Sequence, residues 1–142
     1  MKNILFVCTG NTCRSPMAAG IFNLLAGERG VDARAASAGL AAVNGVPVTE
    51  NAVLAARELD CDIAGHTARQ ITPALLDEAA AIYTMNKNQA DMLRALAPGS
   101  AGKILPLGDR DVADPYGGDL AVYRQTAREI YALVDRLVGE LA

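Results

Sequence analysis

The most constraining feature of the sequence is a short apolar run near the amino terminus that leads into a polar loop and then a helix. The run Ile4–Val7 is too short for a helix and too aliphatic for a loop, so it predicts a buried strand over Lys2–Val7. Apolar residues then recur at helical spacing, with Ser15 predicted as the N-cap and Pro16 as the first helical residue. Cys8 is therefore expected between the carboxyl end of a strand and the amino terminus of a helix.

The rest of the chain alternates between strand and helix patterns, and no stretch has the signal of a β-hairpin. The further strands are predicted over Val31–Ala38, Ala80–Met85 and Lys103–Leu107. The predicted helices are Ser15 to the ending glycines Gly27 and Gly30, Ala52–Leu59 capped by Thr49, Pro73–Ala79 capped by Thr72, Lys87–Ala97 and Leu120–Leu141. Such alternation implies βαβ units. We therefore expect a doubly wound α/β fold, with a four-stranded parallel sheet and helices on both of its faces.

The loop after the first strand has the composition of an anion-binding site. Ligands of doubly wound sheets bind beyond the carboxyl ends of the strands. Free N–H groups at a helix amino terminus, together with a turn containing Gly10 and Asn11, can surround an anion. The planar guanidinium of Arg14 can hold two oxygens of a tetrahedral oxyanion. Cys8 would lie at the base of this cradle, where a cysteine is expected to ionise readily and to attack a bound phosphate.

At these residues the sequence resembles the low-molecular-weight protein-tyrosine-phosphatase family. Cys8 and Arg14 form the C-x5-R-S loop of that family, and the whole stretch Cys8–Ala18 matches its amino-terminal signature. C-x5-R alone also occurs around buried structural cysteines, but the preceding strand and the following Ser-Pro-Met make the match specific. The resemblance implies one phosphatase domain over residues 1–142 and a phosphocysteine intermediate. It also implies substrate binding by Thr9, Gly10, Asn11, Thr12, Cys13 and Ser15.

A general acid is predicted in the loop of residues 108–119. A thiolate that attacks phosphorus needs a proton donor on the opposite side when the leaving group is poor. Asp114 follows the fourth predicted strand and so emerges at the same sheet edge as Cys8. Alone, Asp-Pro would indicate only a turn. In the family, the matching aspartate acts as general acid and then as general base. An aromatic residue at the position of Tyr116 lines the mouth of the family's pocket.

Two residues far from the loop are expected to support it. Ser37-Ala38-Gly39 matches a Ser-Ala-Gly segment of the family, which implies that the Ser37 hydroxyl holds the loop together with Asn11 and Ser15. The segment starting at His66 resembles one whose histidine bonds to the phosphate loop, so we interpret His66 as structural. Its spacing from the cysteines does not fit a metal site. We therefore predict neither a metal nor an organic cofactor.

The identity of the phosphorylated residue stays open, and Thr12 is the main discriminator. Phosphotyrosine enzymes of the family tend to have an aliphatic residue there, whereas Asn-Thr-Cys-Arg-Ser resembles the bacterial protein-arginine-phosphatase branch. A threonine hydroxyl makes the pocket more polar, which favours a guanidinium leaving group over a phenyl ring. Phosphoarginine is our first interpretation and phosphotyrosine the alternative. An arsenate reductase needs a relay of two downstream cysteines, and only Cys61 is present. A non-catalytic phosphate-binding module would have lost Cys8, Arg14 or Asp114.

Composition limits the partners. The formal net charge of −3 argues against general nucleic-acid binding, and no apolar run approaches the length of a membrane span. The three cysteines are an odd number, and two of them belong to one loop, which favours a reducing compartment. We therefore expect a cytoplasmic enzyme whose partner is a phosphorylated protein, without nucleic acid or membrane. The sequence does not indicate the oligomeric state.

Overall fold

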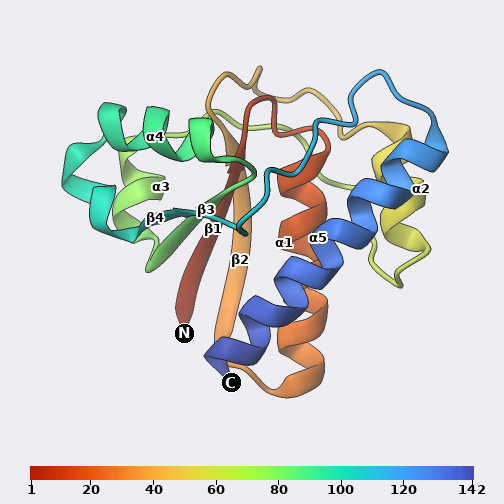
Figure 1. Cartoon of the computed structure of the whole chain (residues 1–142), viewed down its shortest axis with the longest axis horizontal. Coiled ribbons are helices and arrows are strands. Elements are labelled where there is room, and N and C mark those ends of the chain that lie inside the picture. The colour runs from red at the N-terminus through yellow and green to blue at the C-terminus, as the bar shows by residue number, and fades with distance from the viewer.

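The computed structural model describes residues 1–142 and has a four-stranded parallel sheet at its centre, in the order β2-β1-β3-β4 (Figure 1). The strands are β1 (Lys2–Cys8), β2 (Ala33–Gly39), β3 (Ala81–Thr84) and β4 (Ile104–Pro106). β1 pairs with β2 on one side and with β3 on the other. The order reverses at β1, so the loop that follows this strand lies at the topological switch point. The predicted doubly wound α/β fold is confirmed.

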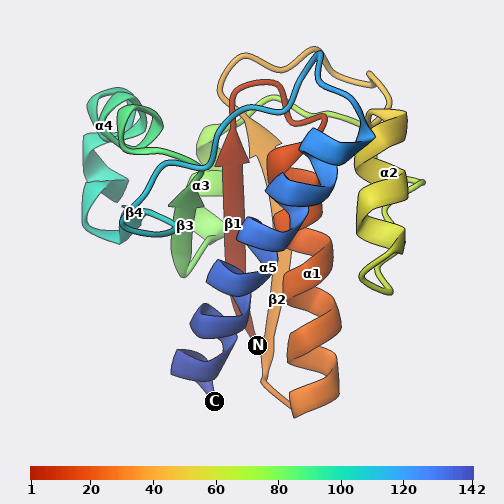
Figure 2. The same cartoon turned by 45° about the vertical axis from the view of Figure 1, so that its right-hand side comes forward.

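Helices cover both faces of the sheet (Figures 1 and 2). One face carries α1 (Arg14–Arg29) and α5 (Leu120–Leu141), with α2 (Glu50–Arg57) packed beside them. The other face carries α3 (Pro73–Glu78), α4 (Lys87–Leu96) and the short 3-10 helix η1 (Pro98–Lys103). None of the helices has both the length and the apolar character needed to cross a membrane.

β1 contributes to two hydrophobic cores because its side chains alternate between the two faces. Ile4, Phe6 and Cys8 face the larger core beneath α1 and α5, where the rings of Phe6 and Phe22 lie 5.9 Å apart. Leu5 and Val7 face the smaller core beneath α3 and α4. A central parallel strand that is buried on both faces has a continuous apolar sequence, which explains the run in this chain.

Two predicted features of α1 are wrong. Ser15 is not the N-cap, because α1 begins at Arg14 with Cys13 in the capping position. The Ser15 hydroxyl lies instead next to the Cys8 thiol. Gly27 does not end the helix, which continues to Arg29. It stops at Gly30, whose left-handed backbone (φ 65°) suits glycine.

The other predicted elements are confirmed in type and order, and all of them except α5 have shifted boundaries. The second strand begins at Ala33 rather than Val31, and the helix predicted over Ala52–Leu59 is α2, which begins at Glu50. Thr72 caps α3 by accepting a hydrogen bond from the backbone N–H of Leu75. The Pro98-Gly99 pair that ends α4 starts η1, which the sequence did not predict. The shifts are of one or two residues, which is the usual uncertainty in where a helix or strand ends.

The loops that follow β1 and β2 and the loop that precedes α5 meet at one end of the molecule, at the top of Figure 2. The carboxyl ends of parallel strands share one edge of the sheet, so this meeting follows directly from the topology. Predicted site residues of the loop after β1 and of the loop before α5 are brought together here.

Candidate active site

The loop of residues 9–13 folds over the end of β1 and buries Cys8, which is 2% exposed. Asn11 takes a left-handed backbone conformation (φ 58°), which asparagine tolerates better than most residues. Gly39 of the neighbouring strand lies so close that a Cβ there would come within 2.7 Å of the Thr9 carbonyl oxygen. The absence of a side chain at Gly39 therefore lets the loop approach the sheet.

Two groups surround the Cys8 sulfur. The Ser15 Oγ lies 2.8 Å from Cys8 Sγ, and the backbone N–H of Asn11 donates to the same sulfur at 3.3 Å. Both groups can donate to a negatively charged sulfur, and hydrogen bonds to charged groups are stronger than neutral ones. The arrangement is suited to stabilising a thiolate.

Asn11 connects the loop to its support. Its amide Nδ2 donates to Ser15 Oγ at 2.8 Å and to Ser37 Oγ at 3.0 Å. Its Oδ1 accepts from the backbone N–H of Arg69 at 3.0 Å. The His66 ring donates from Nε2 to the Asn11 carbonyl oxygen at 3.0 Å, because a carbonyl can only accept. The structure thus places Ser37 and His66 against the loop as predicted.

Arg14 begins α1 and lies almost entirely inside the protein, with 4% exposure. Its Nη1 donates to the Val112 carbonyl oxygen at 2.8 Å, and its Nη2 lies 3.8 Å from Asp114 Oδ2. The buried Nε has no hydrogen-bond partner in the chain. A buried donor without a partner is costly, so a bound anion at this group would satisfy it.

Asp114 and Tyr116 lie on the more open side of the site. The Asp114 side chain is 54% exposed, and its Oδ1 accepts from the backbone N–H of Tyr116 at 3.0 Å. The same oxygen lies 3.9 Å from the Cys13 Sγ. Tyr116 is 72% exposed. The Asp-Pro loop therefore brings a carboxylate to the rim of the cradle, as the sequence predicted.

Burial changes the titration of two groups around the loop. It raises the pKa of the Cys13 thiol to about 11, and the neighbouring Cys8 and Asp114 act in the same direction. Burial also lowers the pKa of His66, against the opposing effect of its hydrogen bond to Asn11, and Arg69 lowers it further. The ring is therefore expected to be neutral at pH 7, which fits a structural hydrogen-bond donor.

Several supporting contacts were not predicted from the sequence. Val112 holds Arg14 through its carbonyl oxygen, and the Thr49 N–H donates to the Thr12 carbonyl oxygen at 2.9 Å. These are backbone contacts, which carry no side-chain signal. Gln89 of α4 donates to the Thr9 hydroxyl at 3.1 Å. Gln89 is buried at 4% exposure, and a buried glutamine is unusual enough to be noticed only once burial is known.

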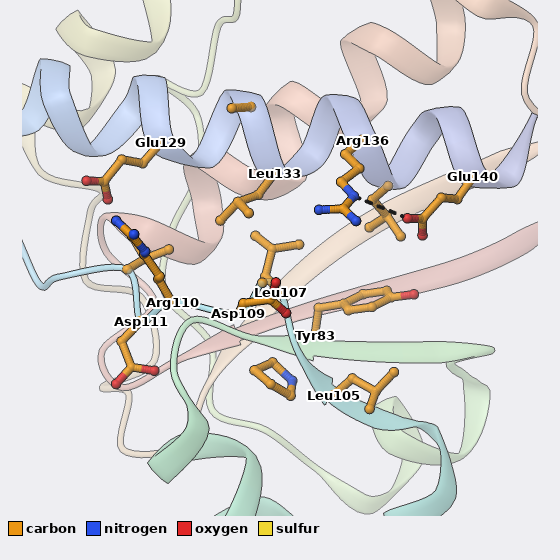
Figure 3. A pocket seen from close by; sticks show the side chains of 15 residues that line it. Tyr83, Leu105, Leu107, Asp109, Arg110, Asp111, Glu129, Leu133, Arg136 and Glu140 are labelled. Carbon is orange, nitrogen blue, oxygen red and sulfur yellow. Dashed lines mark ion pairs between the residues drawn. The ribbon is translucent and has the colours of Figure 1, made fainter.

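A pocket of about 750 Å³ lies away from Cys8, between β4 and the carboxyl-terminal half of α5 (Figure 3). Leu105, Leu107 and Leu133 form its apolar part, and Arg136 and Glu140 form an ion pair at its rim. Its lining contains no cysteine, serine, threonine or histidine, and its ionisable side chains are four carboxylates, two arginines and Tyr83. The chemistry of the chain is concentrated in the Cys8 loop rather than in this pocket.

Known proteins of similar sequence and structure are phosphatases. Residues 3–142 match the family described as low molecular weight phosphotyrosine protein phosphatase. A protein-arginine-phosphatase of Geobacillus stearothermophilus is 36% identical over 144 residues, covering 97% of this chain and 95% of that protein. A low molecular weight protein tyrosine phosphatase from T. tengcongensis is 39% identical and has a TM-score of 0.95, covering 99% of this chain and 100% of that chain.

A second similar structure is a cysteine-to-serine mutant of the YwlE arginine phosphatase with a phosphorylated active-site serine. It is 31% identical, has a TM-score of 0.94 and covers 98% of this chain and 95% of that chain. Fold, loop and sequence similarity thus define a protein phosphatase that acts on a phosphorylated protein. The chain belongs to the low molecular weight phosphotyrosine protein phosphatase family, as its amino-terminal motif predicted.

Proposed function

We propose that this phosphatase removes the phosphoryl group from phosphoarginine in proteins and that Cys8 carries the phosphoryl group between two chemical steps. The observation that carries the choice of phosphoarginine is Thr12, a half-buried residue of the loop whose hydroxyl lies near Gly10, 3.7 Å from the position that a Cβ on that glycine would take. The Thr49 N–H fixes the backbone at Thr12 by its hydrogen bond to the carbonyl oxygen.

In the first step, the Cys8 thiolate attacks phosphorus on the side opposite the leaving nitrogen. The S–P bond forms, the P–N bond breaks, and Asp114 gives its proton to the departing guanidine nitrogen. In the second step, Asp114 takes a proton from a water molecule whose oxygen attacks phosphorus. The S–P bond breaks, inorganic phosphate leaves and the thiolate returns. The serine-phosphorylated YwlE mutant supports a covalent intermediate at this position of the fold.

The remaining residues stabilise charge in these steps. Arg14 would hold two phosphoryl oxygens, and its buried Nε without a partner supports that role. The backbone of residues 9–15 would bind the other oxygens, as expected for a loop at a helix amino terminus. Ser15 and the Asn11 N–H, which already contact the sulfur, would stabilise the thiolate when it leaves. Tyr116 would form one wall of the mouth.

A guanidinium group has several N–H donors, whereas a phenyl ring has none. The Thr12 hydroxyl can accept a hydrogen bond from the guanidinium, and an aliphatic residue would instead pack against a ring. One such side chain changes specificity by about 1–3 kcal/mol, so some phosphotyrosine activity should remain. Phosphotyrosine is the second candidate, because the tyrosine phosphatase from T. tengcongensis is at least as similar in sequence as the arginine phosphatase.

We further propose that the enzyme acts in the cytoplasm on a phosphorylated protein. All three cysteines are free thiols, which supports a reducing compartment such as the cytoplasm. A phosphorylated protein is the proposed partner, and the net charge of −3 supports a partner other than nucleic acid or a membrane surface.

The test is a comparison of kcat/KM on a phosphoarginine peptide and a matched phosphotyrosine peptide. Cys8→Ala, which has no nucleophilic side chain, provides the blank. We expect the unmodified protein to prefer phosphoarginine and Thr12→Ile to reverse the preference by about 10- to 100-fold. A preference of the unmodified protein for phosphotyrosine would contradict the substrate, and no turnover of either peptide would contradict the activity.

A further inference from the structure

Gln89 connects helix α4 to the loop above the nucleophile. It lies in the first turn of α4 and is buried, with 4% exposure. Its backbone N–H donates to the Asn86 side chain at 2.7 Å. Its side-chain Oε1 accepts from the backbone N–H of Met85 at 3.0 Å, and its Nε2 donates to the Thr9 Oγ1 at 3.1 Å. A buried amide that is bonded at both ends has a fixed position.

The partners of Gln89 also fix which end of its amide faces Thr9. The N–H of Met85 can only donate, so the atom that faces it must be the amide oxygen. The amide nitrogen therefore faces Thr9, and the Thr9 oxygen must accept. This orientation follows from hydrogen-bond chemistry and does not depend on distinguishing nitrogen from oxygen by position.

A hydroxyl that accepts from Gln89 still has one proton to donate. The bond from Gln89 is the only hydrogen bond of the Thr9 hydroxyl in the chain, so its proton has no acceptor within the protein. Thr9 follows Cys8 directly and is an exposed residue of the loop. Its backbone is also held, since the Thr9 carbonyl oxygen accepts from the Ala41 N–H at 2.9 Å.

We propose that Gln89 is a positioning residue which makes the Thr9 hydroxyl a hydrogen-bond donor to a phosphoryl oxygen of the bound substrate. The inference rests on the proposed function, in which the loop binds the phosphoryl group. Without Gln89, the Thr9 hydroxyl could rotate and share its proton with water or backbone groups. With Gln89, the donor is oriented before the substrate binds. A donor that does not reorganise on binding gives a stronger contact with an anion.

The test is a double-mutant cycle with Thr9→Val and Gln89→Met, measured as the inhibition constant Ki of inorganic phosphate. Para-nitrophenyl phosphate serves as the reporter substrate. Each single change should raise Ki about tenfold, the loss expected for one hydrogen bond to a charged group. The double mutant should be no worse than either single mutant, because Gln89 acts only through Thr9. The proposal would be overturned if the increase in Ki of the double mutant equalled the product of the two single increases. It would also be overturned if the single changes left Ki unchanged.

Asn86→Ala is the matched control, because it removes the cap of the same helix but leaves the Gln89–Thr9 bond in place. It should lower the melting temperature without changing Ki. Gln89→Glu preserves the acceptor for Met85 but turns the Thr9 proton towards the new carboxylate, and it should raise Ki more than tenfold. An effect of Gln89→Glu no larger than that of Asn86→Ala would overturn the proposal even if Gln89→Met failed to fold.

The Ki of inorganic phosphate tests the role of Gln89 and Thr9 independently of which phosphorylated residue the enzyme prefers. Inorganic phosphate has no leaving group, so its Ki does not depend on whether the enzyme prefers arginine or tyrosine. A phosphotyrosine preference together with coupled effects on Ki would contradict only the proposed substrate. A phosphoarginine preference without any effect on Ki would contradict only the role of Gln89 and Thr9. A KM change for peptides with an unchanged phosphate Ki would likewise overturn the contact with the phosphoryl oxygen.

Discussion

Arg14 donates from Nη1 to the carbonyl oxygen of Val112, which lies 98 residues further along the chain, at 2.8 Å. This bond joins the first turn of α1 to the loop that carries Asp114. A movement of either segment would therefore change the distance between the guanidinium and the carboxylate, which is now 3.8 Å. Through this contact, the position of Arg14, which would bind the phosphoryl group, depends on the position of the loop that carries the proposed general acid Asp114.

Replacing Arg14 with lysine should nearly abolish activity while the positive charge remains. A lysine has no planar fork, so it cannot hold Val112 and two phosphoryl oxygens together. We expect kcat/KM to fall by about 100-fold or more, the cost of removing a hydrogen-bonding group that stabilises the transition state. Steady-state kinetics would check this, with Arg128→Lys on the exposed side of α5 as the control. Retention of more than a third of the activity would contradict the role of the fork.

Replacing Asp114 with asparagine should slow the reaction according to the leaving group. Loss of a general acid typically costs 10²- to 10⁴-fold, and the loss should be largest for a poor leaving group. We therefore expect a greater fall in kcat/KM, which reports the step in which the leaving group departs, for a phosphopeptide than for para-nitrophenyl phosphate. Asp119→Asn is the matched control, since Asp119 caps α5 and asparagine is also a good cap. Equal losses for both substrates would argue against proton donation by Asp114.

Asn11 combines an unusual backbone conformation with several buried hydrogen bonds, and two variants separate these contributions. Asn11→Gly loses the amide but tolerates φ 58°, whereas Asn11→Ala loses the amide and is also strained. We expect a loss of about 3 kcal/mol in the free energy of unfolding for the glycine variant, from unpaired groups at Ser37 and Arg69. Alanine should cost about 1–2 kcal/mol more. Urea unfolding measures both, and equal stabilities would contradict the backbone argument.

His66 should make the stability of the protein depend on pH on the acid side of neutrality. Burial lowers its pKa in the folded protein below the value of 6.5 found in an unfolded chain. Between these two values the unfolded state binds more protons, so stability falls as the pH drops below about 6.5. This contribution is fully present above pH 6.5. Melting temperatures between pH 7.5 and 5 would measure it, and His66→Gln should remove that part of the pH dependence. An identical pH profile for His66→Gln would show that other groups cause it.

The sequence predicted the order of strands and helices because each element carries its own local signal. The run Ile4–Val7 is apolar throughout, as a strand buried on both faces requires. Leu120–Leu141 has both of its predicted ends, and the Asp119 side chain caps its first turn by accepting from the Val122 N–H. The prediction failed at Ser15, whose capping chemistry was used elsewhere. Its hydroxyl bonds to Cys8 and Asn11 instead of capping the helix. The local sequence does not indicate this choice, because Cys8 and Asn11 come close to Ser15 only in the folded loop.

The sequence by itself determined the α/β class, the position of the Cys8 loop and the family, because those depend on patterns within a few neighbouring residues. Only the tertiary structure decided how the loop is held. Val112 lies against Arg14, Arg69 against Asn11, and Gln89 against Thr9. Two of these three contacts use backbone groups, which every residue possesses and no sequence pattern distinguishes. The third depends on burial of a glutamine amide, which is a property of the packed molecule and not of its local sequence.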